Sequence, residues 1–186
     1  LLGRIDGMGV PEPRGQKIFA LNTIARIAIH SGDGEAAASA LERRDALMAE
    51  QAEQIGNESA RRNARAAAAI SQGELAAFSG DFATATDRAR EYMTIIELEA
   101  DPARDEPAHA LLGYVALQQG NAEEAIAHFD QADPDNVYAQ YWRALALEGA
   151  GRTDEAKALF GEVATNNFNS PELALVRAEA EAKAGS

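Results

Sequence analysis

The chain has 186 residues, of which 42 are alanine and none is cysteine, and its formal net charge at pH 7 is -13. The excess of acidic side chains argues against nucleic acid as a partner, and the absence of cysteine excludes disulfides and thiolate metal sites. Alanine is the strongest helix former and lets helices pack closely, so the composition favours many helices in shallow layers over one deep core. No apolar run approaches the roughly 20 residues needed to cross a bilayer.

The first residues predict no regular structure. Residues 1–15 contain several glycines and prolines at positions 11 and 13, which is typical of an irregular lead-in or linker. Because the chain begins with Leu1 and not with methionine, we expect a processed product or a segment of a longer protein, either cytoplasmic or exported.

From residue 16 onward, apolar residues recur at spacings of three and four, which predicts a single helical domain over residues 16–186. The predicted helices span residues 16–31, 34–55, 59–79, 82–100, 107–119, 122–132, 137–150, 153–166 and 171–184. They group into four hairpins and a last helix, over residues 16–55, 59–100, 105–132, 136–166 and 170–184.

A glycine marks the joint in each hairpin and the end of the last helix. A glycine in this place ends a helix in the left-handed conformation, after which another helix can begin. These glycines are Gly32, Gly80, Gly120, Gly151 and Gly185.

Two helix starts carry a capping signal of their own. Asn121 with Glu124 predicts a capping box, in which each side chain bonds to a free backbone N–H of the first turn. Ser170 precedes Pro171, which places a hydroxyl cap before a proline at the first helical position.

Alignment of the chain on the joint glycines reveals a repeat. Seven positions before the glycines lie small residues, namely Ala25, Gly73, Gly113, Ala144 and Ala178. Five positions after the first four glycines lie alanines, namely Ala37, Ala85, Ala125 and Ala156. Nine positions after the same four lie Leu41, Ala89, Phe129 and Phe160. The pattern predicts a small residue where the two helices of a hairpin cross, and buried contacts where the second helix meets the next hairpin.

This pattern resembles the tetratricopeptide repeat. The best match is carried by Leu112, Gly113, Gly120, Ala125, Phe129, Ala132 and Pro134. The glycine spacings of 48, 40, 31 and 34 depart from the family period of 34, and the match is best over residues 105–185. The resemblance implies an all-α, right-handed α-solenoid of about four helical hairpins plus a C-terminal capping helix. The tail around Phe168 is also similar to the ends of some bacterial repeat proteins of unassigned function.

No catalytic or metal-binding constellation is recognisable. The histidines His30, His109 and His128 are scattered, without a second ligand at metal spacing, and no nucleophile motif is present. We expect His128 to pair with Glu124 on the surface of one helix. The sequence therefore predicts a protein that is not an enzyme and that requires no cofactor and no metal.

The only basic cluster consists of Arg61, Arg62 and Arg65 at the start of a long helix. A helix start prefers acidic side chains, so the cluster calls for a specific reason. The arginines either form salt bridges with acidic side chains on the surface and on the neighbouring helix, or they contact an acidic partner.

Aromatic residues indicate the candidate binding surface. Tyr138, Tyr141, Trp142 and Leu145 form a stripe on one predicted helix. In the family that the repeat resembles, the first helix of each hairpin lines the concave groove. That resemblance assigns groove positions to Tyr138, Tyr141, Leu145 and Gly149, and in the preceding repeat to Tyr114 and Gln118. The alternative is that the stripe packs against the neighbouring hairpin.

The first repeat offers a second set of groove residues. Asn22 and Arg26 lie four residues apart on one helix face, which His30 continues. They are the only counterparts of the polar clamp with which some members of that family bind the carboxylate end of a peptide, so we do not expect this chain to capture such a terminus.

The predicted function is a non-catalytic scaffold that binds a peptide or partner protein in its concave groove. Residues 101–186 carry a net charge of -9 and residues 1–100 a net charge of -4, which favours a neutral or basic partner. An uncapped end repeat would also allow self-association into a homo-oligomer. The alternative function is a sensory, regulatory or ligand-binding segment of a larger multidomain protein.

Overall fold

The computed structural model describes residues 14–97 and 102–185, and all regular structure in these ranges is helical. The first two hairpins consist of α2 (Arg14–His30), α3 (Gly34–Ile55), α4 (Glu58–Phe78) and α5 (Phe82–Ile96). A short 3-10 helix, Pro102–Asp105, leads into the second half. That half contains α6 (Glu106–Gln118), α7 (Ala122–Phe129), α8 (Val137–Gly149), α9 (Thr153–Thr165) and α10 (Pro171–Ala184).

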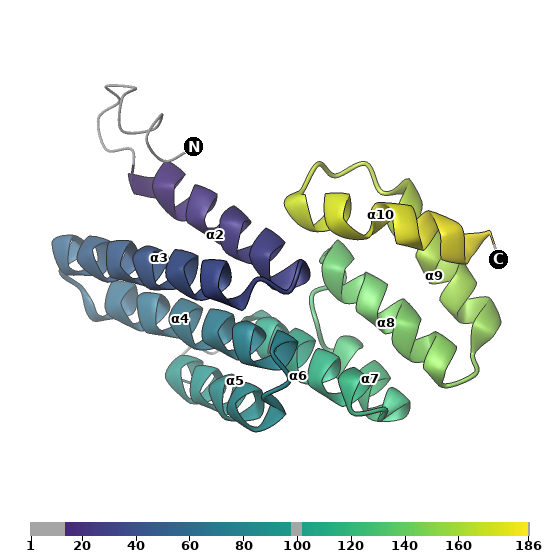
Figure 1. The fold of residues 1–186 in the computed structure, drawn as a ribbon. Coiled ribbons are helices and arrows are strands. Elements are labelled where there is room, and N and C mark those ends of the chain that lie inside the picture. The colour runs from purple at the N-terminus through teal and green to yellow at the C-terminus, as the bar shows by residue number, and fades with distance from the viewer. Residues whose placement is uncertain (1–13, 98–101, 186) are drawn as a thin grey trace.

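Consecutive helices pack as hairpins, and consecutive hairpins pack on one another. The last helix, α10, packs against α9 and α8 and also contacts α2, so the stack curves until its two ends meet (Figure 1). This is an all-α helical repeat solenoid, and the predicted fold class is confirmed. No helix in the described residues is long and apolar enough to cross a membrane.

The glycine joints adopt the predicted conformation inside the hairpins. Gly32, Gly80, Gly120 and Gly151 all have φ values between 76° and 83°. The prediction for Gly185 is wrong, because this residue has a right-handed φ of -93° and continues the last turn of α10. Gly56, which the repeat pattern did not mark, also ends a helix, α3, in the left-handed conformation with a φ of 75°.

One of the two predicted caps is present. The Ser170 hydroxyl accepts a hydrogen bond from the backbone N–H of Leu173 at 3.1 Å. The capping box at Asn121 is wrong, since the Asn121 amide donates to the Glu124 carboxylate at 3.2 Å and neither side chain caps the backbone.

The repeat positions mark the contacts between helices. All four alanines that follow the joint glycines by five residues are buried, and so are the four residues that follow by nine. At Gly113, an added Cβ would lie 2.9 Å from the Phe129 ring, so only glycine allows α6 and α7 to approach this closely. The prediction fails at Ala178, which is exposed while Ala180 is buried. The reason is that α10 has no following helix to close a fifth hairpin.

The ends of several helices differ from the prediction. Helix α2 begins at Arg14, inside the predicted lead-in, and residues 1–13 lie outside the described part. Helix α5 ends at Ile96, and residues 98–101 are likewise outside it. Helix α7 ends at Phe129, three residues before the predicted end, because Pro134 and the turns before it leave no room for another helical turn.

Candidate functional site

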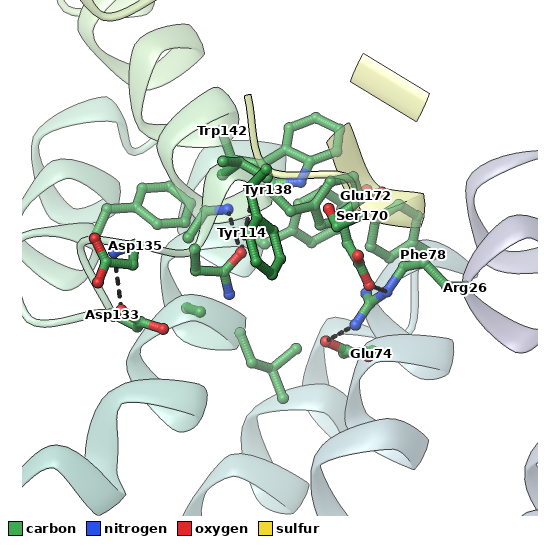
Figure 2. A pocket seen from close by; sticks show the side chains of 17 residues that line it. Arg26, Glu74, Phe78, Tyr114, Asp133, Asp135, Tyr138, Trp142, Ser170 and Glu172 are labelled. Atoms are coloured by element: carbon green, nitrogen blue, oxygen red, sulfur yellow. Dashed lines mark hydrogen bonds and ion pairs between the residues drawn. The ribbon is translucent and has the colours of Figure 1, made fainter. Parts of the chain in front are cut away.

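A cleft of about 270 Å³ opens where α2, α4, α6 and α8 face the start of α10. These are the first helices of the four hairpins and the last helix, so the cleft lies on the concave side of the curved stack. We call it the aromatic cleft (Figure 2). Its lining includes Arg26, Glu74, Phe78, Tyr114, Asp133, Asp135, Asn136, Tyr138, Trp142, Phe168, Ser170 and Glu172.

Four aromatic rings from three hairpins form one wall of the cleft. Phe78 and Tyr114 stack with their ring centroids 4.3 Å apart and their planes 6° from parallel. The Trp142 ring meets Tyr114 and Tyr138 edge-on, at centroid distances of 4.9 and 5.5 Å. These are favoured aromatic geometries, and they hold the rings in fixed orientations.

The wall contains one unsatisfied hydrogen-bond donor. The indole Nε1 of Trp142 is buried and has no acceptor among the described residues. A buried N–H without a partner costs about 1–3 kcal/mol of folding free energy, and this one lies behind the surface of the cleft. Burial raises the pKa of the Tyr114 hydroxyl to about 12 and also raises that of Tyr138, so both phenols remain protonated at neutral pH.

Arg26 closes one end of the cleft. Its Nη2 lies 3.1 Å from Glu74 and its Nε lies 3.6 Å from Glu172, which links α2 to α4 and α10. The guanidinium also lies over the Tyr138 ring, 5.2 Å from the centroid. Burial disfavours the charged form, but Glu74, together with Tyr138 and Glu172, outweighs it and raises the pKa of Arg26, so the side chain stays cationic.

Two carboxylates from the loop between α7 and α8 lie at the opposite end (Figure 2). The backbone N–H of Asp135 donates to the Asp133 carboxylate at 2.8 Å, which orders the loop. The next residue, Asn136, caps α8 by accepting hydrogen bonds from the N–H groups of Tyr138 and Ala139 at 3.1 and 3.2 Å.

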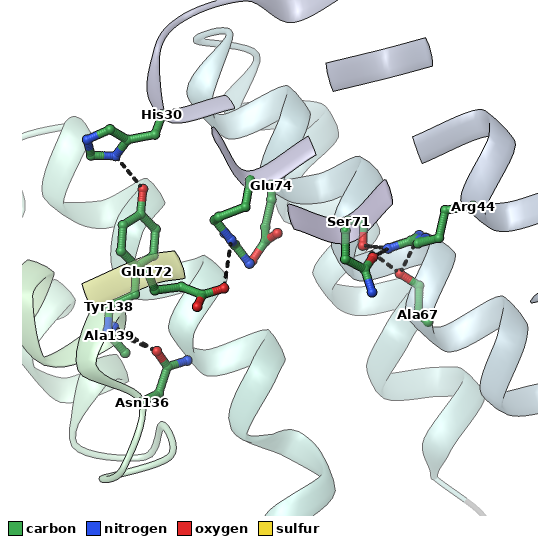
Figure 3. A network of polar contacts seen from close by, with 11 residues as sticks. His30, Arg44, Ala67, Ser71, Glu74, Asn136, Tyr138, Ala139 and Glu172 are labelled. Atoms are coloured by element: carbon green, nitrogen blue, oxygen red, sulfur yellow. Dashed lines mark hydrogen bonds and ion pairs between the residues drawn. The ribbon is translucent and has the colours of Figure 1, made fainter. Parts of the chain in front are cut away.

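A second, larger cavity of about 660 Å³ lies beyond Arg26 and shares Arg26, Glu74, Ser170 and Glu172 with the aromatic cleft. Arg44 forms its floor and is only 4% exposed. Its guanidinium donates to Ser71, to the Asn22 side chain at 3.2 Å and to the Ala67 carbonyl at 3.3 Å (Figure 3). These bonds join α2, α3 and α4, so this buried arginine has a structural role.

The structure brings together four of the predicted site residues. Tyr114, Tyr138, Trp142 and Arg26 all line the aromatic cleft. Asn22 lines only the second cavity, where its side-chain oxygen accepts from Arg44.

The other three predicted residues do not line either of these cavities. Tyr141 is 3% exposed and packs against Phe160 at a centroid distance of 5.9 Å, so it belongs to the core. Leu145 is half-buried against the same core, and Gln118 is exposed. The predicted aromatic stripe on α8 therefore does not face the cleft along its whole width. Residues at spacings of three and four cover a broad face of the helix, and part of that face packs against α9.

Two functional residues that the sequence analysis missed follow the register of the repeat. Glu74 lies six residues before Gly80, as Arg26 and Tyr114 do before their own glycines, and Phe78 lies two residues before Gly80. Extending the groove positions to the second hairpin would have found both. Asp133, Asp135 and Glu172 belong to no such register, and nothing in the sequence marked them.

The histidines and the basic cluster form contacts within the chain. His30 Nδ1 lies 2.9 Å from the Tyr138 hydroxyl, and His109 Nδ1 lies 3.1 Å from His128 Nδ1. His128 thus contacts α6, and it also interacts electrostatically with Glu124 on its own helix, the residue with which it was expected to pair. No group of three or more metal-ligating side chains occurs in the described residues.

The arginine cluster is explained by ion pairs. Arg61 bonds to Glu53 on the preceding helix at 2.8 and 3.0 Å, and Arg65 bonds to Glu58 at 3.2 Å. This favours the salt-bridge interpretation over an acidic partner.

Comparison with family models supports the repeat assignment. Tetratricopeptide repeat models match residues 116–180 and residues 66–91. No curated protein and no solved structure matches the chain. The two matched segments contain all of α7, α8 and α9 and most of α4, α5 and α10, where glycine joints and buried alanines recur. With its nine α-helices in the described residues and these two matches, the chain is a tetratricopeptide repeat protein.

Proposed function

We propose that the aromatic cleft binds a segment of a partner protein without catalysing a reaction. Tetratricopeptide repeats generally mediate protein–protein interaction, and the cleft lies on the concave side of the solenoid. The observation that carries the proposal is the wall of four aromatic rings, Phe78, Tyr114, Tyr138 and Trp142, that lines the cleft. Aromatic rings provide a large contact area for the side chains of a peptide and are enriched among the residues that dominate binding energy.

The shape of the site favours an extended segment. The aromatic cleft of about 270 Å³ has room for a few side chains, and it is contiguous with the larger cavity beyond Arg26. A segment several residues long could place one side chain against the aromatic wall and continue past Arg26 toward Asn22. The exposed ring of Phe168 lines both cavities and adds apolar contact area at the rim.

The experiment uses Trp142 as its own reporter, because it is the only tryptophan in the chain. A peptide array selects binding sequences, and titration of the selected peptides is followed by Trp142 emission and by calorimetry. We expect a change in emission on binding, and about tenfold weaker binding in Tyr114→Ala, since truncated aromatic anchors are typical of binding hot spots. Because Tyr114 is only half-buried, we expect the Tyr114→Ala variant to fold, and circular dichroism checks that it does.

Gln118→Ala provides the matched control. Gln118 lies on the same helix four residues later, is exposed and lines neither cavity. The proposal is rejected if the selected peptides leave Trp142 emission unchanged, or if a folded Tyr114→Ala binds them as tightly as the wild type does.

A second candidate function is binding of a small polar molecule in the larger cavity, as in a sensory segment. The polar lining of that cavity, with Asn22, Asn63 and Ser71, favours it. A screen of polar metabolites by thermal shift distinguishes the two. A stabilising metabolite that leaves Trp142 emission unchanged, with no peptide binding, would support this second function.

A further inference from the structure

Charge is distributed unevenly in the aromatic cleft. Among the described residues that line it, four are carboxylates, namely Glu74, Asp133, Asp135 and Glu172, and one is a cation, Arg26. Glu74 and Glu172 lie at one end, and both are within 4 Å of Arg26. Asp133 and Asp135 lie at the other end, across the aromatic wall (Figure 2).

Arg26 demonstrates what this lining accommodates. Its guanidinium rests on the face of the Tyr138 ring and contacts two carboxylates at the same time. Cations over aromatic faces gain energy when partly desolvated, and guanidinium groups combine ring stacking with hydrogen bonds to carboxylates. One end of the cleft is therefore already occupied by an arginine that the chain itself supplies.

The other end has the same chemistry without an internal cation. The Asp133 carboxylate is half-buried, and neither it nor Asp135 forms an ion pair with another described residue. Tyr114 and Trp142 line the same cleft between the two ends. A partly buried carboxylate without a counter-ion, beside aromatic rings, attracts a cationic side chain and repels an acidic one.

Resting on the proposed function above, we infer that the partner segment places an arginine or lysine side chain between Tyr114, Trp142 and the Asp133–Asp135 carboxylates. An acidic or phosphorylated segment is disfavoured at this place, because it would bring a further negative charge to an end of the cleft that has only carboxylates.

The test compares peptides of one length in which the central residue is arginine, lysine, glutamine or leucine and the flanking positions are randomised. Binding is measured by Trp142 emission and calorimetry at low salt. We expect the arginine or lysine series to bind about tenfold more tightly than the glutamine series, with a ratio that declines as salt rises.

The double variant Asp133→Asn/Asp135→Asn tests the carboxylates directly. Asparagine retains the oxygen that accepts the Asp135 N–H bond, so the loop keeps its turn. We expect this variant to reduce the preference for a cation to less than about twofold while leucine peptides bind as before. The control variant Asp154→Asn/Glu162→Gln removes the same charge from exposed positions of α9, outside the cleft, and should keep the preference.

The outcomes separate this inference from the function on which it depends. If leucine or glutamine peptides bind as tightly as arginine peptides, and Tyr114→Ala weakens them, the cleft binds peptides and the inference about the cation is overturned. If both double variants reduce the preference equally, the effect is one of net charge and the inference is also overturned. If no series binds, the proposed function fails and the inference fails with it.

Discussion

The first hairpin and the last one form the same structural unit, but they differ in helix length and in the size of their core side chains. Helices α2 and α3 have 17 and 22 residues, whereas α8 and α9 have 13 each. The long hairpin buries mainly alanine with a few leucine and isoleucine residues, in two small clusters. The short hairpin belongs to one continuous core that includes Phe129, Tyr138, Tyr141 and Phe160.

The difference shows that length can replace side-chain volume. Small residues bury little apolar area each, so more helical turns are needed for the same contact, and alanine lets the helix axes approach closely. The first hairpin also buries Arg44, whose bonds to α2 and α4 add specific polar contacts. The longer family match, residues 116–180, falls on the half in which short helices carry large residues.

Equivalent core positions provide the strongest test of this comparison. Phe160 and Leu41 both lie nine residues after their joint glycine, and both are buried. We expect Phe160→Ala to lower the free energy of unfolding by about 3–5 kcal/mol and Leu41→Ala by about 2–3 kcal/mol, because the larger continuous core loses more contacts. Urea unfolding, followed by circular dichroism and by Trp142 emission, measures both.

The control for this pair is Phe168→Ala. Its ring is 73% exposed, so the variant should change stability by less than about 0.5 kcal/mol. Equal losses in Phe160→Ala and Leu41→Ala would show that the two hairpins do not differ in the way their cores suggest.

Substitution of the glycines where two helices cross should change the free energy of unfolding less than the core truncations do. We expect Gly113→Ala to destabilise by about 1–2 kcal/mol, because the new Cβ would lie 2.9 Å from the rigid Phe129 ring. Gly73→Ala should cost less, since the nearest atom is the end of the flexible Leu111 side chain. Thermal or urea unfolding of the two variants gives the comparison.

Gly161→Ala calibrates the intrinsic effect of alanine in a helix. No atom lies within 4 Å of a Cβ added at Gly161, so the variant should stabilise by up to about 1 kcal/mol. If Gly73→Ala lowers the free energy of unfolding more than Gly113→Ala does, the contact of Gly113 with the Phe129 ring is not the more rigid of the two.

Acid sensitivity is the smallest expected effect. Burial and the neighbouring His109 lower the pKa of His128 below 6.5, and burial with Arg26 lowers that of His30. Below pH 6.5 the unfolded chain therefore binds these protons more readily than the folded chain does, and the free energy of unfolding decreases as the pH falls.

Variants separate the contributions of the two halves. In His128→Gln and in His30→Gln, the loss of stability between pH 7.5 and pH 5.5 should be smaller than in the wild type. The measurement is the difference in urea midpoint between the two pH values. If a variant shows the same difference in urea midpoint as the wild type, the replaced histidine does not contribute to the pH dependence of stability.

Much of the fold could be predicted because its signals are local. The left-handed glycines at Gly32 and Gly151 and the cap at Ser170 depend on the backbone within a few residues. The site was predictable only in part. Tyr114 and Tyr138 were found from the repeat register and Trp142 from the aromatic stripe, whereas Glu172 and Asp133 reach the cleft from a helix and a loop that the register does not cover.

The sequence by itself determined that this protein is a stack of helical hairpins and where each hairpin turns, because helix period, caps and glycine joints act over short separations. Only the tertiary structure decided how far the stack curves. Curvature accumulates from small rotations at each hairpin interface, which depend on the side chains packed there. That curvature brings Arg26 of the first helix to Glu172 of the last and closes one end of the aromatic cleft.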